Sequence, residues 1–187
     1  KMFDESMVLK EKLFGARSRE YAGGINNLGY LYMETGRLSL SEKFYLDALD
    51  IWKETVGTNH PDYGMTLMNL GVLYDNLGNS QIALEMFEKA KVITETRLGK
   101  DHPDYANLLN NMAKSQSELG MFKEAEVNYK AALQLLETTK GPNSPYYAIG
   151  LSNLAKVYRR TKRYVEATTV LEQSAKIFES TVGKDHP

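Results

Sequence analysis

Glycine recurs at intervals of 42 residues along this chain of 187 residues, and other residue types keep the same step. The glycines are Gly15, Gly57, Gly99, Gly141 and Gly183. The matching tyrosines are Tyr21, Tyr63, Tyr105 and Tyr147, and the matching asparagines are Asn27, Asn69, Asn111 and Asn153. A fixed period of about 20–50 residues indicates one supersecondary unit that is repeated and stacked on its neighbours.

Each repeat is predicted to contain two helices. In the second repeat the first helix begins near Pro61, and its apolar face is Leu67, Leu70, Gly71 and Tyr74. This i, i+3, i+4, i+7 spacing is typical of one stripe of an α-helix, here about 16 residues long. Glycine ends helices in the left-handed conformation. The turns are therefore expected at Gly36, Gly78 and Gly120.

The pattern predicts a single all-α repeat domain over residues 1–187, a right-handed α-α superhelix of antiparallel helix pairs. Residues 1–14 are expected to be the second helix of an incomplete repeat. The complete repeats are expected at 19–57, 61–99, 103–141 and 145–183. Both ends of the sequence interrupt the pattern, so we expect the chain to be part of a longer array or a larger protein.

Composition restricts the class of protein further. There is no cysteine, which excludes disulfides and thiolate metal sites and favours a reducing compartment, so we expect a cytoplasmic protein. The charges balance, with 23 Lys and Arg against 24 Asp and Glu, and no continuous basic stripe of the kind that binds nucleic acid is present. No apolar run is long enough to span a membrane.

The sequence contains no recognisable catalytic or cofactor site. No phosphate-binding glycine motif is present, and no strand is readable that could carry a nucleophile. His60, His102 and His186 occupy equivalent linkers, so stacking keeps them one or two repeats apart and they cannot meet on one metal ion. We therefore expect no enzyme activity, no cofactor and no metal, and a structural role in the linkers for the histidines.

The repeat resembles the tetratricopeptide repeat, with a Leu-Gly or Leu-Ala pair, a Tyr four residues after the Leu, and an Ala-aromatic-Ala pattern in the second helix. The linker Gly99-Lys100-Asp101-His102-Pro103-Asp104-Tyr105 and the helix segment Leu109-Asn110-Asn111-Met112 are similar to the 42-residue repeats of the kinesin light chain class. Two departures, Gln116 for the tyrosine and Lys162 for the turn glycine, predict local irregularity.

The asparagine at a fixed position in all four first helices needs an explanation, because asparagine is a mediocre helix former. It either links neighbouring helices through hydrogen bonds or binds the backbone of a peptide, since its amide both donates and accepts. The resemblance favours peptide binding, because first helices line the concave groove of tetratricopeptide domains.

We expect Asn69 and Asn111 to act mainly in binding. The residues predicted to bind peptide share this face: Asn27, Tyr30, Asn69, Val72, Asn76, Asn107, Asn111, Lys114, Asn153, Lys156, Arg159 and Arg160. Lys156, Arg159 and Arg160 lie at i, i+3 and i+4, on one side of the helix. The bound segment is therefore expected to carry acidic residues.

Three hypotheses for function remain open. The first is an adaptor or scaffold module that binds a protein or peptide in its groove, without nucleic-acid or membrane partners. The second is a regulatory array in a larger signalling protein or a CHAT-type protease. The third is a structural solenoid that self-associates through its exposed repeat ends.

Overall fold

The computed structural model describes residues 9–182, which are helices joined by short turns and linkers. The all-α class with antiparallel helix pairs is confirmed for this part of the chain. The chain divides into two compact units, residues 1–99 and 100–187. The predicted position of Gly183 and His186 and the first half of the predicted leading helix lie outside the described residues.

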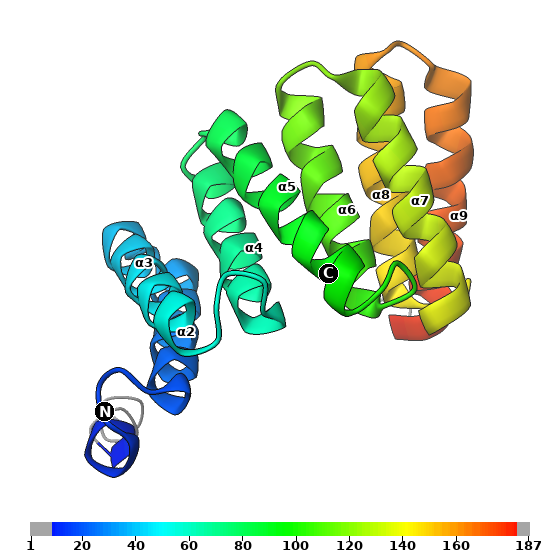
Figure 1. The fold of residues 1–187 in the computed structure, drawn as a ribbon. Helices are drawn as coiled ribbons and strands as arrows, with labels where there is room; N and C mark the ends of the chain where they lie inside the picture. Colours follow the sequence, from blue (N-terminus) through cyan, green and yellow to red (C-terminus); the bar gives the residue numbers. More distant parts are fainter. Residues whose placement is uncertain (1–8, 183–187) are drawn as a thin grey trace. The chain divides into compact units, whose positions relative to one another are not determined.

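Unit 1 contains two helix pairs. Residues 9–14 are helical. They are followed by α2 (Arg19–Glu34), α3 (Leu38–Thr55), α4 (Pro61–Asn76) and α5 (Ser80–Arg97). Each of these helices packs against its pair partner, and α4 also contacts α3 and α2 (Figure 1).

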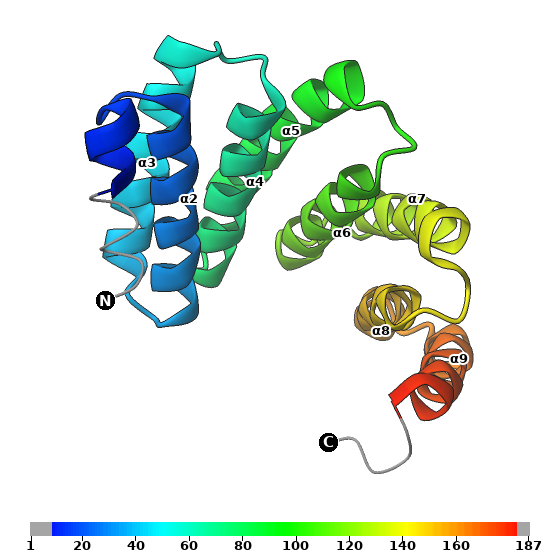
Figure 2. The same cartoon turned by 90° about the horizontal axis from the view of Figure 1, so that it is seen from below.

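Unit 2 has the same arrangement. Its helices are α6 (Pro103–Glu118), α7 (Phe122–Lys140), α8 (Pro145–Arg160) and α9 (Tyr164–Val182). Here α8 contacts α7 and α6 in addition to its partner α9. Figure 2 shows the two pairs of this unit in a second view. The four first helices each have 16 residues, as the sequence pattern predicts.

The turns within the pairs follow the glycine prediction. Gly36, Gly78 and Gly120 have φ angles of 73°, 78° and 78°. Lys162 takes the same role in the last pair with φ 62°, the only positive φ of a non-glycine residue among those described. The irregularity expected there does not occur, because Arg163 N donates to Tyr158 O at 2.8 Å, as Arg37 N does to Tyr32 O.

The two helices of the first pair approach each other at small residues. Ser41 is fully buried in α3 and its hydroxyl donates to Gly29 O on α2 at 2.7 Å. The Tyr45 ring packs directly against Gly29. This contact is possible because glycine has no side chain, and a Cβ atom at Gly29 would collide with the ring. The Trp52 ring is buried among Ala22, Ile25 and neighbouring apolar residues.

One polar contact joins the two pairs within each unit in the same way. In unit 1 the Tyr74 hydroxyl donates to Glu42 Oε1 at 2.7 Å, and in unit 2 the Tyr158 hydroxyl donates to Glu126 Oε1 at 3.4 Å. Burial is the main cause that raises the pKa of Tyr74 to about 12, and the hydrogen bond to Glu42 is the second. The hydroxyl therefore stays a donor at any physiological pH.

No helix in the described part of the chain is long and apolar enough to cross a lipid bilayer.

Candidate peptide-binding faces

The first helices begin at residues whose side chains cap the helix N-terminus. The Ser18 and Ser144 hydroxyls accept from the backbone N–H groups of Tyr21 and Tyr147 at 3.1 and 3.2 Å. Side-chain acceptors at this position satisfy amides that have no partner within the helix. Each first helix therefore begins at the same position of its repeat.

His60 and His102 are caps of the same kind. Their Nδ1 atoms accept from the backbone N–H groups of Asp62 and Asp104, each at 3.2 Å. This is the structural role expected of the linker histidines. Within residues 9–182, no group of three or more potential metal ligands lies close enough together to hold an ion.

The candidate face of unit 1 combines amides with exposed apolar side chains. Asn27 and Asn76 are exposed, Asn69 and Val72 are partly buried, and Tyr30 is 52% exposed. A tyrosine that a helix presents to solvent in this way offers a flat apolar surface with a polar tip.

Asn69 also has a structural partner. Its Nδ2 donates to Oδ1 of Asn26 on α2 at 3.3 Å, so it links the two first helices of unit 1. The side chain of Asn27, by contrast, makes no hydrogen bond with any described residue. The helix-linking interpretation of the asparagine column therefore applies to Asn69 and does not apply to Asn27.

Unit 2 repeats this division. Asn153 Nδ2 donates to Asn110 Oδ1 on α6 at 3.1 Å, which links α8 to α6. The side chain of Asn111 has no hydrogen-bond partner among the described residues and lies partly exposed. Asn107 and Lys114 are exposed on the same helix.

The basic residues on α8 are not equivalent. The Arg160 guanidinium pairs with Glu118 of α6 at 3.1 Å and lies over the Phe122 ring at 5.1 Å. Lys156 Nζ donates to Asn153 Oδ1 at 3.0 Å. Arg159 is exposed and forms no hydrogen bond or ion pair with any described residue, so of these three cations it is the most available to a ligand.

Sequence reasoning missed the bridging role of Asn26 and Asn110 and the pairing of Glu118 with Arg160. The signal for the first two was present as the adjacent pairs Asn26-Asn27 and Asn110-Asn111. The period of 42 did not indicate these bonds, because Asn69 and Asn153 each bond a residue 43 positions earlier. That residue precedes the equivalent asparagine of the earlier repeat by one position.

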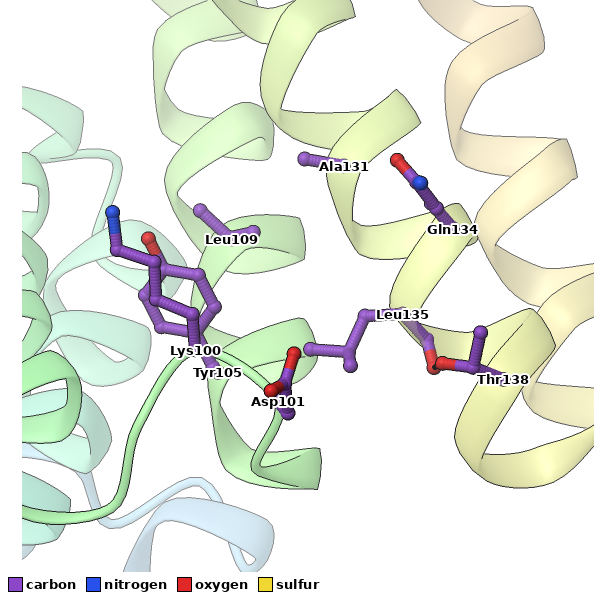
Figure 3. Close-up of a pocket in the computed structure, with 8 residues that line it drawn as sticks. All are labelled: Lys100, Asp101, Tyr105, Leu109, Ala131, Gln134, Leu135 and Thr138. Carbon is purple, nitrogen blue, oxygen red and sulfur yellow. Dashed lines mark hydrogen bonds between the residues drawn. The ribbon is translucent and has the colours of Figure 1, made fainter.

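A hollow of about 300 Å³ lies elsewhere on unit 2, between α6 and α7. Figure 3 shows Tyr105 and Leu109 on one side and Leu135 on the other, with Lys100 and Asp101 at the linker. Ala131 lines it, at a position that Lys89 and Gln173 occupy in the neighbouring repeats. None of the residues predicted to bind peptide lines it.

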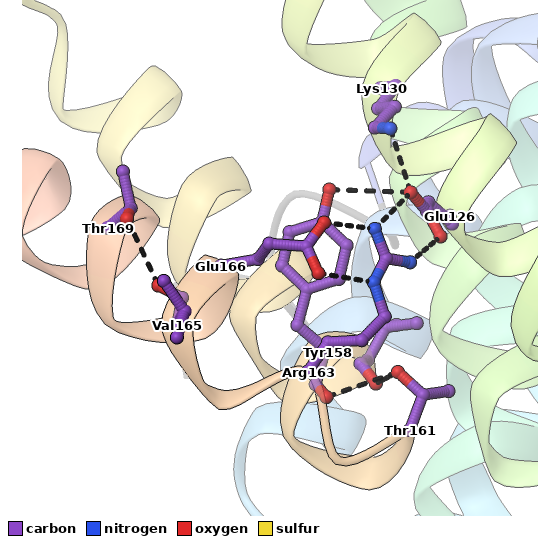
Figure 4. Close-up of polar contacts among 9 residues, drawn as sticks. Glu126, Lys130, Tyr158, Thr161, Arg163, Val165, Glu166 and Thr169 are labelled. Carbon is purple, nitrogen blue, oxygen red and sulfur yellow. Dashed lines mark hydrogen bonds and ion pairs between the residues drawn. The ribbon is translucent and has the colours of Figure 1, made fainter.

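The densest polar cluster of unit 2 is structural. The Arg163 guanidinium lies over the Tyr158 ring at 4.3 Å and pairs with both Glu126 and Glu166 (Figure 4). Lys130 Nζ pairs with Glu126 at 2.7 Å. The hydrogen bond from Arg163, and to a smaller extent that from Lys130, holds the pKa of Glu126 below its usual value. The cluster joins α7 to the turn between α8 and α9.

Comparison with solved structures supports the fold. A chain described as BtubC (BKLC) from P. vanneervenii matches with a TM-score of 0.82 and 20% identity, over 100% of this chain and 74% of that one. Two structures of a Podosopora anserina kinesin light chain-type protein with nearly identical TPR-like repeats match with TM-scores of 0.77 and 0.74, at 20% and 19% identity. They cover 97% and 96% of this chain, and 85% of the other chain in each case.

A comparison with proteins of curated function finds no significant match. The family model of the tetratricopeptide repeat matches residues 20–96, 77–138 and 104–180, which together include most of the chain. With the kinesin light chain-like neighbours, this match confirms the resemblance seen in the sequence. The chain belongs to the tetratricopeptide repeat family.

Proposed function

We propose that this chain is a protein-interaction module whose first helices hold an extended segment of a partner protein. Tetratricopeptide repeats are generally protein-interaction modules. The proposal extends this to a cytoplasmic adaptor or scaffold role and to the particular faces formed by α2 with α4 and by α6 with α8.

The spare amides of Asn27 and Asn111 carry the proposal. Both stand inside helices, where asparagine is less favourable than alanine by roughly 0.5 kcal/mol. Neither side chain contributes a hydrogen bond to the fold of the described residues. Each can donate to a peptide C=O and accept from a peptide N–H at the same time, a pairing that does not depend on the sequence of the ligand.

The neighbouring side chains supply selectivity. Tyr30 and Val72 offer apolar contacts on unit 1, whereas Lys156 and Arg159 offer positive charge on unit 2. We therefore propose that a segment bound on unit 2 carries acidic residues. Arg160 contributes less than its position indicates, because Glu118 already balances its charge.

A peptide array tests this function. We would probe immobilised 12-residue peptides of random sequence with the full chain and with the Asn27→Ala and Asn111→Ala double variant. The expected result is binding by the parent chain and at least a fivefold loss for the variant, with an unchanged or slightly raised unfolding midpoint. Asn143→Ala, at an exposed linker position, is the matched control and should bind as the parent does.

Two results would contradict the proposal. The first is an array on which the parent chain binds no peptide above background. The second is a double variant that unfolds much earlier while its remaining folded fraction binds normally, since the asparagines would then act in the fold.

Self-association is a second candidate, favoured by the exposed apolar side of α9. Leu171 is 47% exposed, whereas its counterpart Tyr129 in α7 is 3% exposed because α8 lies close to it. Tyr164 and Val165 are exposed on the same helix. Sedimentation equilibrium over a hundredfold range of concentration tests this candidate, and a constant monomer mass would exclude it.

A further inference from the structure

The two bridging asparagines present different groups to a ligand. Both have the NH₂ end of the amide fixed, Asn69 by Asn26 at 3.3 Å and Asn153 by Asn110 at 3.1 Å. The carbonyl end of each amide is thereby turned away from the neighbouring helix. An amide held in this way can act towards a ligand chiefly as an acceptor, through Oδ1.

In unit 2 this acceptor is already occupied. Lys156 lies one turn beyond Asn153 on α8, and its Nζ donates to Asn153 Oδ1 at 3.0 Å. Asn153 is thus engaged at both ends. The position three residues after Asn69 is Val72, which has no donor, and no described residue donates to Asn69 Oδ1.

We propose that Lys156 makes Asn153 a conditional contact, which opens only to a ligand with a carboxylate at the matching position. This inference rests on the proposed peptide-binding function and specifies its selectivity. A ligand carboxylate attracts the exposed ammonium of Lys156, and a charged acceptor forms a stronger hydrogen bond than an amide oxygen does. Release of Lys156 leaves Asn153 Oδ1 free to accept a backbone N–H from the same ligand.

The two faces then differ in kind. Unit 1 accepts a peptide N–H at Asn69 whatever the neighbouring ligand side chain is. On unit 2 the ligand must first draw Lys156 away with a carboxylate before Asn153 can accept its backbone N–H. With a neutral ligand, Asn153 Oδ1 stays bonded to Lys156. Lys156 acts here as a residue that determines specificity, by a route distinct from simple attraction of opposite charges.

The experiment separates these two routes. Peptides of 12 residues are prepared in pairs that differ only by Asp→Asn and Glu→Gln, and pairs that bind through unit 2 are identified by their sensitivity to Asn111→Ala and not to Asn27→Ala. Affinities are then measured by fluorescence anisotropy for the full chain and for Lys156→Met, which keeps the length of the aliphatic stem without the donor or charge.

The inference predicts an affinity gain as well as a loss. The parent chain should prefer the acidic member of a pair about tenfold, which corresponds to about 1.4 kcal/mol. In Lys156→Met the acidic member should weaken while the neutral member binds about threefold more tightly, because Asn153 Oδ1 is now free. Adding Asn153→Ala to Lys156→Met should abolish that gain. Val72→Lys should place the same acid preference on unit 1.

The alternatives give different results. If Lys156 acts only as a charge, Lys156→Met weakens the acidic peptides and leaves the neutral ones unchanged, which overturns the inference and leaves the proposed function intact. If no peptide binds at all, the proposed function fails and the inference with it. Because Lys156 is exposed, its substitution should not alter the thermal midpoint by more than about 1 °C, which circular dichroism checks.

Discussion

Gly29 lies where α2 approaches the ring of Tyr45 on α3. A Cβ atom added at Gly29 would lie 2.7 Å from both Cδ1 and Cε1 of that ring. Carbon atoms in ordinary contact are about 3.5–4.0 Å apart. Tyr45 has no exposed surface, so its ring has no space into which it could turn. Replacement of Gly29 by alanine should therefore force the two helices apart.

The expected magnitude follows from two opposing effects. Overpacking of a well-packed core destabilises by up to about 3 kcal/mol. Alanine is a better helix former than glycine by about 1 kcal/mol, which reduces the net loss to roughly 2 kcal/mol. Gly23→Ala is a matched control in the same helix, because the nearest atom to its added Cβ, on Trp52, is 3.9 Å away. It should stabilise by about 0.5–1 kcal/mol.

Urea titration followed by tryptophan fluorescence is the appropriate assay. Trp52 is the single tryptophan of the chain and is buried in α3, so its emission reports unfolding of unit 1. Tyr45→Leu in the Gly29→Ala background should recover part of the loss, since the corresponding pair in the last repeat is Ala155 with Leu171. If Gly29→Ala unfolds at the same urea concentration as Gly23→Ala, the helices relax freely and the reasoning is wrong.

Three further results are expected. Lys162→Gly should stabilise unit 2 by about 0.5–1 kcal/mol, because relief of the left-handed backbone exceeds the added freedom of the unfolded chain; thermal melts should show the rise, and an unchanged midpoint would contradict it. Glu126 has a lowered pKa when folded, so its ion pairs stabilise above the usual value of 4.5 and are lost as the pH falls through the folded value. The parent should therefore be more stable than Glu126→Gln at pH 7, and the difference in urea midpoint should shrink as the pH falls through the lowered pKa of Glu126; a constant difference would refute this assignment. Glu118→Gln should release Arg160 and tighten acidic peptides about two- to threefold at low salt, whereas equal tightening of their amide counterparts would exclude a charge effect.

The helices could be predicted from the sequence because the information is local. Apolar spacing, the proline at the start of a first helix and the glycine at each turn act within a few residues, and the structure has helix bounds close to those expected. The spare and bridging asparagines could not be distinguished in this way. Asn27 and Asn69 occupy the same position in their repeats, and only the packing of α4 against α2 brings Asn26 to one and not to the other.

The basic residues show the same limit. Helical spacing correctly places Lys156, Arg159 and Arg160 along α8, but it does not reveal that Glu118 lies across from Arg160 or that Lys156 turns back to Asn153. Lys162 illustrates the reverse case. The sequence predicted irregularity where the glycine is missing, and yet the flanking helices and their backbone hydrogen bonds hold a lysine in the left-handed conformation.

The bonds between helix pairs have a consequence for how such an array can grow. A shift of 42 residues replaces Tyr74 by Gln116, Asn26 by Met68 and Glu42 by Leu84, and the last two lack the oxygen acceptor of their counterparts. A shift of 84 residues restores all three groups, as Asn110, Glu126 and Tyr158.

A module of four helices can therefore be removed without loss of these bonds at the new junction. Removal of residues 61–144 would bring Asn26 to Asn153 and Glu42 to Tyr158, which preserves both kinds of bond. Removal of 103–144 would instead bring Asn153 to Met68 and Tyr158 to Leu84, and neither bond could form. Loss of the third repeat alone should consequently be tolerated less well than joint loss of the second and third repeats.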